Sequence, residues 1–536
     1  METKTPKDPA ERTEDYQVQT SRLNKFFGRK ETLFFTIASV VGIDTIGVVS
    51  AAGPVAFSWM VILTIIFVIP SAMVFAELSA AFPSQGAPYM WVRLAFGRLA
   101  GSVSNVFYWI RNPIWFGGVL TIVAVIAAET FFMSGEQMSE FSFYRFSFAF
   151  IWIGIVSSNY KYKVGKWVPA IGTLTRLLLL TLFTITLVAY GFKNGLRGVA
   201  FVDFGLSFPG LLVIIGVVLF SFLGIESQSN AIEEMVDHKR DGIYAIFRGT
   251  GFAIAMFLIP IFAVLLVLPV DQVTGLTGFI DACKTAFTVY GGSIAEDNTV
   301  TLSGAGIYLG GLAGLLIIIT VFSSGVSWIM ASSRALAVSS QDFTAPKFLG
   351  VINPRYGTPV RVNNLSGVVA SIAMVLAYKI TDGNSAKYFG VALSVVITTT
   401  LITYVLIFPA FLRLRTLFPD VKRPYFVPAS RTVSIWLTLV VAFGIIQILL
   451  PGIGESWFSD TFRPAGWQRS EGTLYFITAL VPLLVIKLIG ILFWAIGRTN
   501  LKRVNRGESV TLDDAPDQSD QISENVGDES NNEDIN

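Results

Sequence analysis

Apolar stretches long enough to cross a lipid bilayer dominate this chain. A membrane-spanning helix needs about 20 consecutive, mainly apolar residues. Twelve stretches meet this need, some with interruptions: 32–51, 58–80, 97–131, 145–159, 168–191, 209–232, 247–268, 301–333, 361–379, 386–412, 432–450 and 473–497. Hydrophobic residues make up 53% of the 536 residues and charged residues only 14%, and the mean hydropathy is +0.62. The sequence therefore predicts an all-α integral membrane protein with about twelve transmembrane helices.

Lys and Arg accumulate in alternate connections between these stretches. Basic residues cluster at 22–30, 93–98, 161–166, 239–248, 334–361, 413–431 and 498–506, whereas the connections that alternate with these hold far fewer. Connections on the cytoplasmic side of a membrane are the ones enriched in Lys and Arg. We therefore expect a multi-pass protein of the plasma membrane with both termini in the cytoplasm.

Two carboxylates lie inside stretches that otherwise suit lipid. Asp44 falls in the first stretch and Glu226 in the sixth, and an isolated ionisable group in hydrocarbon costs at least ~2.5 kcal/mol. Small or polar residues surround both acids, namely Gly42, Thr45, Gly47, Gly224, Ser227, Gln228 and Ser229. Such residues suit an unwound helix whose backbone groups bind a solute near the bilayer midplane. The alternative is that either acid merely pairs with a neighbouring helix.

The two interruptions lie five spans apart. Two inverted repeats of five helices, with discontinuous helices 1 and 6 and two extra helices, would give this spacing. The predicted parts are a cytoplasmic segment at 1–31, repeats at 32–191 and 192–413, helices 11 and 12 at 414–499, and an acidic tail at 500–536. The tail has almost nothing to bury, so we expect it to be disordered in the cytoplasm.

The composition argues against several classes of site. One cysteine, Cys283, and one histidine, His238, cannot supply a disulfide framework or a metal site with several His or Cys ligands. The sequence has no nucleophile motif and no large soluble domain. We therefore expect a protein that is not an enzyme, with no cofactor, metal or nucleic acid. Its expected partners are a small-molecule solute and membrane lipid, and the oligomeric state is left open.

Three segments carry a resemblance to a known superfamily. Residues 76–97, "AELSAAFPSQGAPYMWVRLAFG", follow the second span, residues 220–241 cover the sixth, and residues 333–362 follow the eighth. In these segments the chain resembles the amino acid, polyamine and organocation transporters, which share the leucine-transporter fold. The similarity runs in order through most of residues 32–412. It implies secondary active transport of a small solute by alternating access.

The resemblance also implies where the solute binds. In this superfamily, backbone amides of the first unwound segment hold an amino acid carboxylate, and carbonyls of the sixth span hold the amino group. Helix N-termini favour anions and C-termini favour cations, which agrees with that arrangement. The matching residues are Gly42, Ile43, Asp44, Thr45, Phe220, Phe222, Gly224 and Ile225. Phe220 falls where relatives place an aromatic lid over the substrate.

Asp44 departs from the pattern of the superfamily. Relatives usually carry a Gly-Ser-Gly type of run where this chain has Gly-Ile-Asp. A carboxylate there would repel a substrate carboxylate 4 Å away by ~4 kcal/mol at an effective dielectric constant near 20. Either Arg111, Arg176 or a coupling cation neutralises Asp44, or the solute is not a simple zwitterion.

Arg176, in the fifth span, bears on ion coupling. It aligns with a position where some sodium-independent relatives carry a Lys whose charge stands in for sodium. The resemblance therefore implies sodium-independent transport, coupled to protons or driven by exchange. Because arginine hardly releases its proton, the expected proton carrier is Asp44 or Glu226. Arg111 and Arg176 could instead be purely structural charge partners.

Four further residues are candidates for the solute pocket. Arg111 and Trp115 lie in the third span, and Ser323 and Ser324 lie in the eighth, where hydroxyls could line the solute path or a cation position. Helix packing is the competing explanation for the serines. The sequence favours a permease or exchanger for amino acids or related amines. The alternative is a polyamine or inorganic cation transporter, for potassium for example, of the same fold.

Overall fold

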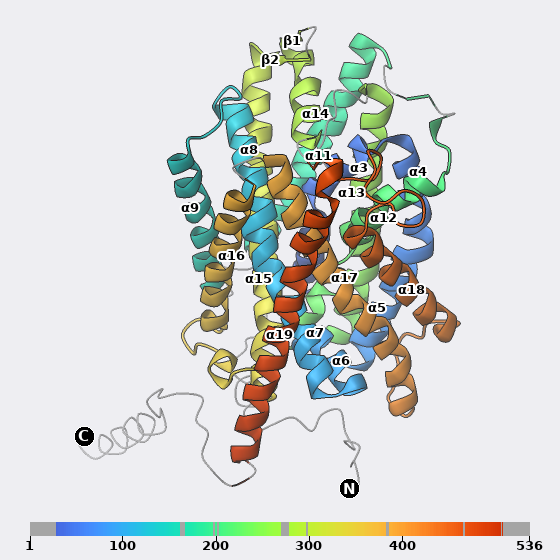
Figure 1. Cartoon of the computed structure of the whole chain (residues 1–536), viewed down its shortest axis with the longest axis vertical. Helices are drawn as coiled ribbons and strands as arrows, with labels where there is room; N and C mark the ends of the chain where they lie inside the picture. The colour runs from blue at the N-terminus through green and yellow to red at the C-terminus, as the bar shows by residue number, and fades with distance from the viewer. Residues whose placement is uncertain are drawn as a thin grey trace, which may run out of the picture.

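The computed structural model describes residues 28–160, 167–196, 199–200, 203–269, 278–295, 298–381, 385–464, 467–504 and 506. Most of them are helical, and the long helices stand side by side along one axis of the molecule (Figure 1). Within these ranges, the sheet content is one antiparallel hairpin of β1 (Gly292–Ile294) and β2 (Val300–Leu302). The acidic tail predicted at the C-terminus lies outside the described residues.

The helices follow the twelve apolar stretches closely. The first five spans contain α2 (Arg29–Val40), α3 (Ile43–Ala51), α4 (Gly53–Leu63), η1 (Thr64–Val68), α5 (Ile69–Ala81), α7 (Arg98–Ile114), η2 (Trp115–Leu120), α8 (Thr121–Phe132), α9 (Glu140–Asn159) and α11 (Trp167–Asn194). The later spans contain α12 (Phe208–Ser221), η4 (Ser227–Glu234), α13 (His238–Val267), α15 (Ala305–Gln341), α16 (Val360–Ile380), α17 (Ser385–Leu417), α18 (Ser430–Leu449) and α19 (Gly472–Val504). The connections contain α6 (Ala87–Phe96), α14 (Gly278–Phe287), η7 (Thr288–Tyr290), η8 (Lys347–Gly350) and η9 (Arg469–Glu471).

The expected fold class is confirmed. Ten helices in the described part of the chain are long and apolar enough to cross a membrane, and the bent pair α2 and α3 makes an eleventh span. The shorter apolar helix α12 lies where the sixth span was expected. The inverted relation between the two sets of five helices, and the domain boundaries based on it, remain predictions.

Helices 1 and 6 are both interrupted, as the sequence predicts. Val41 and Gly42 have extended backbones between α2 and α3, whose axes differ by 45°. After α12, residues 222–226 form turns before the 3₁₀ helix η4. Gly224 has a φ of +114°, which a residue with a Cβ rarely adopts. Backbone groups at both breaks are therefore left outside the regular helical hydrogen-bond pattern.

Two spans contain π-helical stretches beside prolines. η1 precedes Pro70, and η2 follows Pro113. Proline has no N–H, and its ring crowds the carbonyl four residues earlier, so Pro70 disturbs the hydrogen-bond ladder of η1, whereas Pro113 acts on the turn before η2. π-helical turns inside α-helices occur often at functional sites. The first residue of η2 is Trp115, which belongs to the cavity described below.

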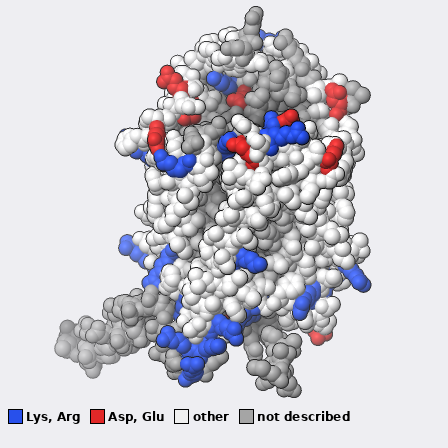
Figure 2. Space-filling model, in the orientation of Figure 1, with Lys and Arg blue, Asp and Glu red and all other residues white. Residues whose placement is uncertain are grey.

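Charged side chains gather at the two ends of the molecule and leave a mainly uncharged belt between them (Figure 2). Large apolar side chains are exposed at the middle of the outer helices, including Leu178 on α11, Ile372 on α16 and Leu488 on α19. Lipid is the solvent that covers such a belt without an energetic penalty. The surface thus agrees with the helix lengths in indicating a membrane-embedded bundle.

Candidate functional site

A small cavity lies beside both helix breaks. It is lined by Ser39, Val40, Gly42, Thr45, Arg111, Asn112, Trp115, Phe220, Ser221, Leu223, Trp328, Val396 and Thr400. The two interrupted spans therefore meet α7, η2, α15 and α17 around one space. Its volume is about 20 Å³, enough for about one water molecule. A solute of the size of an amino acid can enter only when lining side chains or helix segments move apart.

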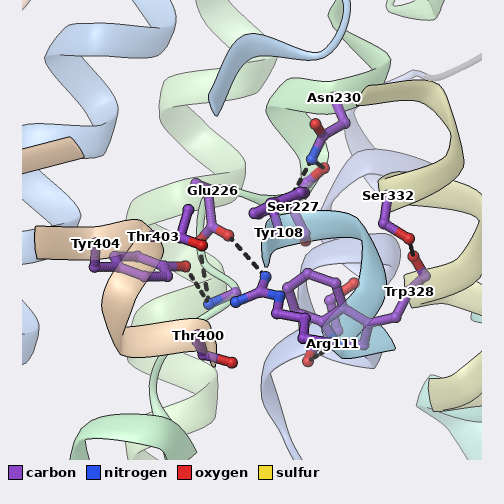
Figure 3. Close-up of polar contacts among 12 residues, drawn as sticks. Tyr108, Arg111, Glu226, Ser227, Asn230, Trp328, Ser332, Thr400, Thr403 and Tyr404 are labelled. Carbon is purple, nitrogen blue, oxygen red and sulfur yellow. Dashed lines mark hydrogen bonds and ion pairs between the residues drawn. The ribbon is translucent and has the colours of Figure 1, made fainter. Parts of the chain in front are cut away.

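Arg111 on α7 is held tightly at the wall of this cavity (Figure 3). Its guanidinium carbon lies 4.4 Å from the ring centroid of Tyr108 and 4.6 Å from that of Trp328. Its Nη2 lies 3.6 Å from Oε1 of Glu226, and the two side chains are only 3% and 0% exposed. The ring faces attract the cation, and the carboxylate compensates its charge. Arg111 is thus a buried cation with a fixed orientation.

Glu226 organises the second helix break. Its Oε2 accepts a hydrogen bond from the Gly224 N–H at 3.1 Å, and the Tyr404 hydroxyl accepts from the same N–H at 3.3 Å. Trp328 on α15 packs so closely that a Cβ at Gly224 would lie 2.5 Å from its ring. Nε1 of Trp328 donates to the Ser39 carbonyl at the end of α2, at 2.8 Å. One network of contacts therefore joins both breaks to α15 and α17.

An aromatic pair closes another part of the wall. Trp115 and Phe220 both line the cavity, and their rings meet edge to face with centroids 6.2 Å apart. Phe220 is partly exposed, whereas Trp115 is buried. Because both rings border so small a space, a rotation of Phe220 would enlarge it.

Arg176 lies behind the cavity, at the junction of α11, α15 and α2. Its side chain is fully buried. Nη2 donates hydrogen bonds to Oγ of Ser324 at 2.5 Å and to the carbonyl of Thr320 at 3.5 Å. Ser324 in turn donates to the Ala38 carbonyl, two residues before the end of α2, at 3.4 Å. A fixed positive charge is therefore present next to the first interrupted span.

Some of the site residues proposed from the sequence line the cavity, and the others lie around it. Gly42, Thr45, Arg111, Trp115 and Phe220 line the cavity. Ile43, Phe222, Gly224, Ile225 and Glu226 are buried behind that lining. The hydroxyls of Ser323 and Ser324 are directed at the carbonyls of Val168 and Ala38, and neither serine lines the cavity. The side chain of Asp44 is outside the described part of the chain, so its pairing with Arg111 or Arg176 remains a prediction.

Several lining residues are not evident from the sequence. Trp328 on α15 and Thr400 on α17 lie far along the chain from both breaks. A signal for Thr400 exists in the run of three threonines, 398–400, within an apolar span. Trp328 follows Ser324 by one helical turn, so the serines point to the correct helix but not to the residue that contacts the cavity.

The arrangement is suited to binding charged groups. The first helix break contains the N-terminus of α3, which no side chain caps, and such an end presents free N–H groups and a partial positive charge. The C-terminal ends of α2 and α12 offer carbonyl groups with the opposite partial charge. In the part of the chain that the structure describes, no group of three or more His, Cys, Asp or Glu side chains could hold a metal ion.

Comparisons with known proteins identify the family. A family model described as amino acid permease matches residues 27–462. An uncharacterized transporter of Legionella pneumophila is 27% identical over 76% of this chain and 85% of its own length. A probable agmatine/putrescine antiporter and a glutamate/gamma-aminobutyrate antiporter, both of Lactococcus lactis, are 23% and 22% identical, each over 79% of this chain and 88% and 83% of their own lengths. This chain therefore belongs to the amino acid permease family, in the superfamily that its sequence resembles, and is a membrane transporter and not an enzyme.

Proposed function

We propose that the protein is a sodium-independent exchanger or proton-coupled permease for amino acids or related amines, working by alternating access. The observation that carries this proposal is the cavity between two helix breaks, in a bundle whose charged surface side chains lie mainly at its two ends (Figure 2). Relatives that span most of the chain are named as antiporters for agmatine and putrescine or for glutamate and gamma-aminobutyrate. Both names favour small solutes with an amino group.

The solute is proposed to bind across the two breaks. With Asp44 neutralised by a proton or an arginine, its carboxylate would lie at the N-terminus of α3, near Gly42 and Thr45, because free N–H groups and the helix dipole favour an anion there. Its amino group would lie at the C-terminus of α12, near Phe220, where carbonyls favour a cation. Phe220 would act as a lid that rotates when the solute enters.

Arg176 supports independence from sodium. Its guanidinium donates to a serine hydroxyl and a backbone carbonyl beside the first interrupted span, and oxygens of these kinds are also the ligands of hard cations. A fixed charge in that place would repel a second cation at short range. If a proton is coupled to transport, the proposed carriers are Asp44 and Glu226, since arginine as a residue type hardly releases its proton.

Exchange in proteoliposomes tests this function. Purified protein would be reconstituted in vesicles loaded with an unlabelled amino acid or amine, and uptake of the labelled compound would be followed with sodium or choline as the external cation. We expect uptake that needs an internal exchange partner or a proton gradient and is equal in both salts. No uptake of any amino acid or amine would refute the proposal.

The runner-up is an inorganic cation transporter of the same fold, favoured by the acid at position 44 in the first break. Rubidium flux into the same vesicles distinguishes the two functions. Electrogenic rubidium uptake that is independent of amino acids would favour the runner-up. Rubidium uptake no faster than in protein-free vesicles would eliminate it.

The orientation proposed is a plasma membrane protein with cytoplasmic termini. The end of the molecule at which α19 finishes carries mostly Lys and Arg, and the opposite end carries both signs of charge (Figure 2), as the positive-inside tendency requires. A protease-cleavable tag after residue 506 would test it. We expect the tag to resist protease added to intact cells and to be cleaved after permeabilisation.

A further inference from the structure

Arg111 is the one charged side chain among the described residues that line the cavity. Its Nε and Nη2 atoms are buried, and neither makes a hydrogen bond within the described structure. Glu226 is the neighbouring acid, but the 3.6 Å between Nη2 and Oε1 exceeds the length of a charge-assisted hydrogen bond, about 2.7–2.9 Å. Glu226 is fully buried and does not line the cavity. Of this pair, only the arginine belongs to the described wall of the cavity, and its buried Nε and Nη2 reach a solute only when the side chain turns away from Glu226.

The chemistry of the unsatisfied donors points to a carboxylate. The Nε and Nη2 hydrogens of an arginine lie on one edge and match the two oxygens of a carboxylate. Buried donors without a partner are costly, so an acceptor that reaches them is favoured. The flanking rings of Tyr108 and Trp328 hold the guanidinium plane, so little side-chain entropy is lost when an anion binds.

The charge of Arg111 at the cavity wall distinguishes solutes with a second carboxylate from solutes with a second amine. The α-carboxylate of an amino acid is already provided for at the N-terminus of α3 under the proposed function. With Asp44 neutralised by a proton or by Arg176, Arg111 remains available for a second acidic group on the same solute. An additional amine in the place of that acid would be repelled by the guanidinium at short range. The cavity wall thus favours dicarboxylic solutes over diamines.

We propose that Arg111 is a specificity-determining residue that selects amino acids with a second carboxylate, glutamate and aspartate being the simplest, and that it rejects diamines. This inference rests on the proposed function, because it names the solute class of the same cavity. Binding of the second carboxylate draws Arg111 away from Glu226. The solute and Glu226 therefore share one cation, and Glu226 also holds the N–H of Gly224 at the second break.

Ligand-dependent thermal stabilisation of the purified full-length protein tests the proposal. The probes are glutamate, its neutral isostere glutamine, and putrescine, and a ligand raises the unfolding temperature according to its concentration relative to Kd. We expect the wild type to bind glutamate about tenfold to hundredfold more tightly than glutamine, which is the range for one hydrogen-bonded charge pair. Putrescine should bind weakest.

Two variants isolate the role of Arg111. Arg111→Lys keeps the positive charge but loses the planar edge with two N–H donors. It should reduce the preference for glutamate over glutamine severalfold. The double variant Arg111→Gln/Glu226→Gln removes both charges, so no unpaired buried ion remains to unfold the protein, and it should bind glutamate no better than glutamine. Lys379→Met is the matched control, because it removes a positive charge from an exposed ion pair with Glu140 on the surface. Its glutamate preference should equal that of the wild type.

The outcomes separate this inference from the function on which it rests. Equal affinity of the wild type for glutamate and glutamine, or tighter binding of putrescine, would overturn the role of Arg111 while leaving amino acid or amine exchange intact. A parallel loss of glutamate and glutamine binding in both variants would mean that Arg111 only supports the structure. Absence of binding and exchange for every amino acid and amine would instead refute the proposed function itself.

Discussion

Arg176 and Ser324 form a buried hydrogen bond of 2.5 Å that links α11 to α15, and Ser324 extends this link to the Ala38 carbonyl of α2. Three spans thus converge on one guanidinium at the place where the first interrupted span begins to unwind. A membrane interior gives no water to replace these contacts, so their loss leaves polar groups unsatisfied. The charge and the hydrogen bonds of Arg176 both stabilise this junction.

Replacing Arg176 should expose its role in ion coupling. We expect wild-type exchange to be unchanged when sodium is replaced by choline, and Arg176→Met to lose at least about tenfold in exchange rate, since a hydrogen bond to a charged group contributes about 1.5–3 kcal/mol. Labelled uptake into proteoliposomes measures both. Thr184→Val is the control on the same helix, because its hydroxyl bonds only to the Leu180 carbonyl one turn earlier. Strict sodium dependence of the wild type would contradict the assignment.

The helix breaks could be predicted from sequence, whereas the contacts of the site could not. Glycines beside an acid in an apolar stretch are a local signal, and both Gly42 and Gly224 lie at observed breaks. The approach of Arg111 to Glu226 depends on how helices far apart in the chain pack. Hydropathy leaves that packing undetermined, because every span in a bundle is apolar on most sides.

The serines of α15 show that the sequence also leaves the rotation of a single helix undetermined. Successive residues on a helix point about 100° apart, so Ser323 and Ser324 face different neighbours, Val168 of α11 and Ala38 of α2. The cavity is reached by Trp328 of the same helix. Composition identifies a helix rich in small polar residues, but the rotation of that helix is set by tertiary packing.

Removing the buried carboxylate of Glu77 should destabilise the protein strongly. Glu77 at the end of α5 is 1% exposed. It accepts hydrogen bonds from Nε of Arg415 at 2.8 Å and from the Val427 N–H at 2.7 Å, and Nε of Arg423 lies 3.5 Å away. Glu77→Gln leaves two guanidinium groups without their counter-charge, so we expect a loss of about 3–5 kcal/mol in the free energy of unfolding. Thermal unfolding of detergent-solubilised protein measures this.

An exposed ion pair provides the control for Glu77. Glu140 pairs with Lys379 at 2.8 Å, but both side chains are more than half exposed, and exposed pairs contribute little. Glu140→Gln should therefore leave the unfolding temperature unchanged. Equal unfolding temperatures for Glu77→Gln and Glu140→Gln would show that the Glu77 cluster does not stabilise the fold.

Tyr89 should make stability fall at alkaline pH. This residue of α6 donates a hydrogen bond to Oδ2 of Asp342 at 2.5 Å, and burial together with the charge of Asp342 raises the pKa of Tyr89 well above its ordinary value of 10.0. The hydroxyl therefore keeps its proton in the folded protein at a pH where the unfolded chain loses it. The stabilisation is complete below about pH 10 and is lost as the pH rises towards the folded-state pKa.

Tyr89→Phe tests that alkaline dependence. At pH 7.5 the variant should be less stable than the wild type by about 1.5–3 kcal/mol, because a hydrogen bond to a charged acceptor is lost. The difference should shrink above pH 10, since only the wild type loses stability through this tyrosine. Thermal unfolding across pH measures it, and Tyr308→Phe, which removes a hydroxyl from a residue that is 81% exposed, is the control. A difference that stays constant through pH 11 would contradict the raised pKa.

A methyl group at position 224 should push Trp328 away from the second helix break and slow exchange. Gly224 has a φ of +114°, and its added Cβ would lie 2.5 Å from the ring of Trp328, so Gly224→Ala combines backbone strain, about 1–3 kcal/mol, with overpacking. Trp328 would have to leave the Ser39 carbonyl and the guanidinium of Arg111. We therefore expect exchange to fall at least about tenfold, as 1.4 kcal/mol corresponds to tenfold, with a lower unfolding temperature.

Gly251→Ala in α13 is the matched control for Gly224→Ala. Its Cβ would meet nothing within 4 Å, and alanine has a higher helix propensity than glycine. A wild-type exchange rate for Gly224→Ala would show that the cavity wall tolerates displacement of Trp328.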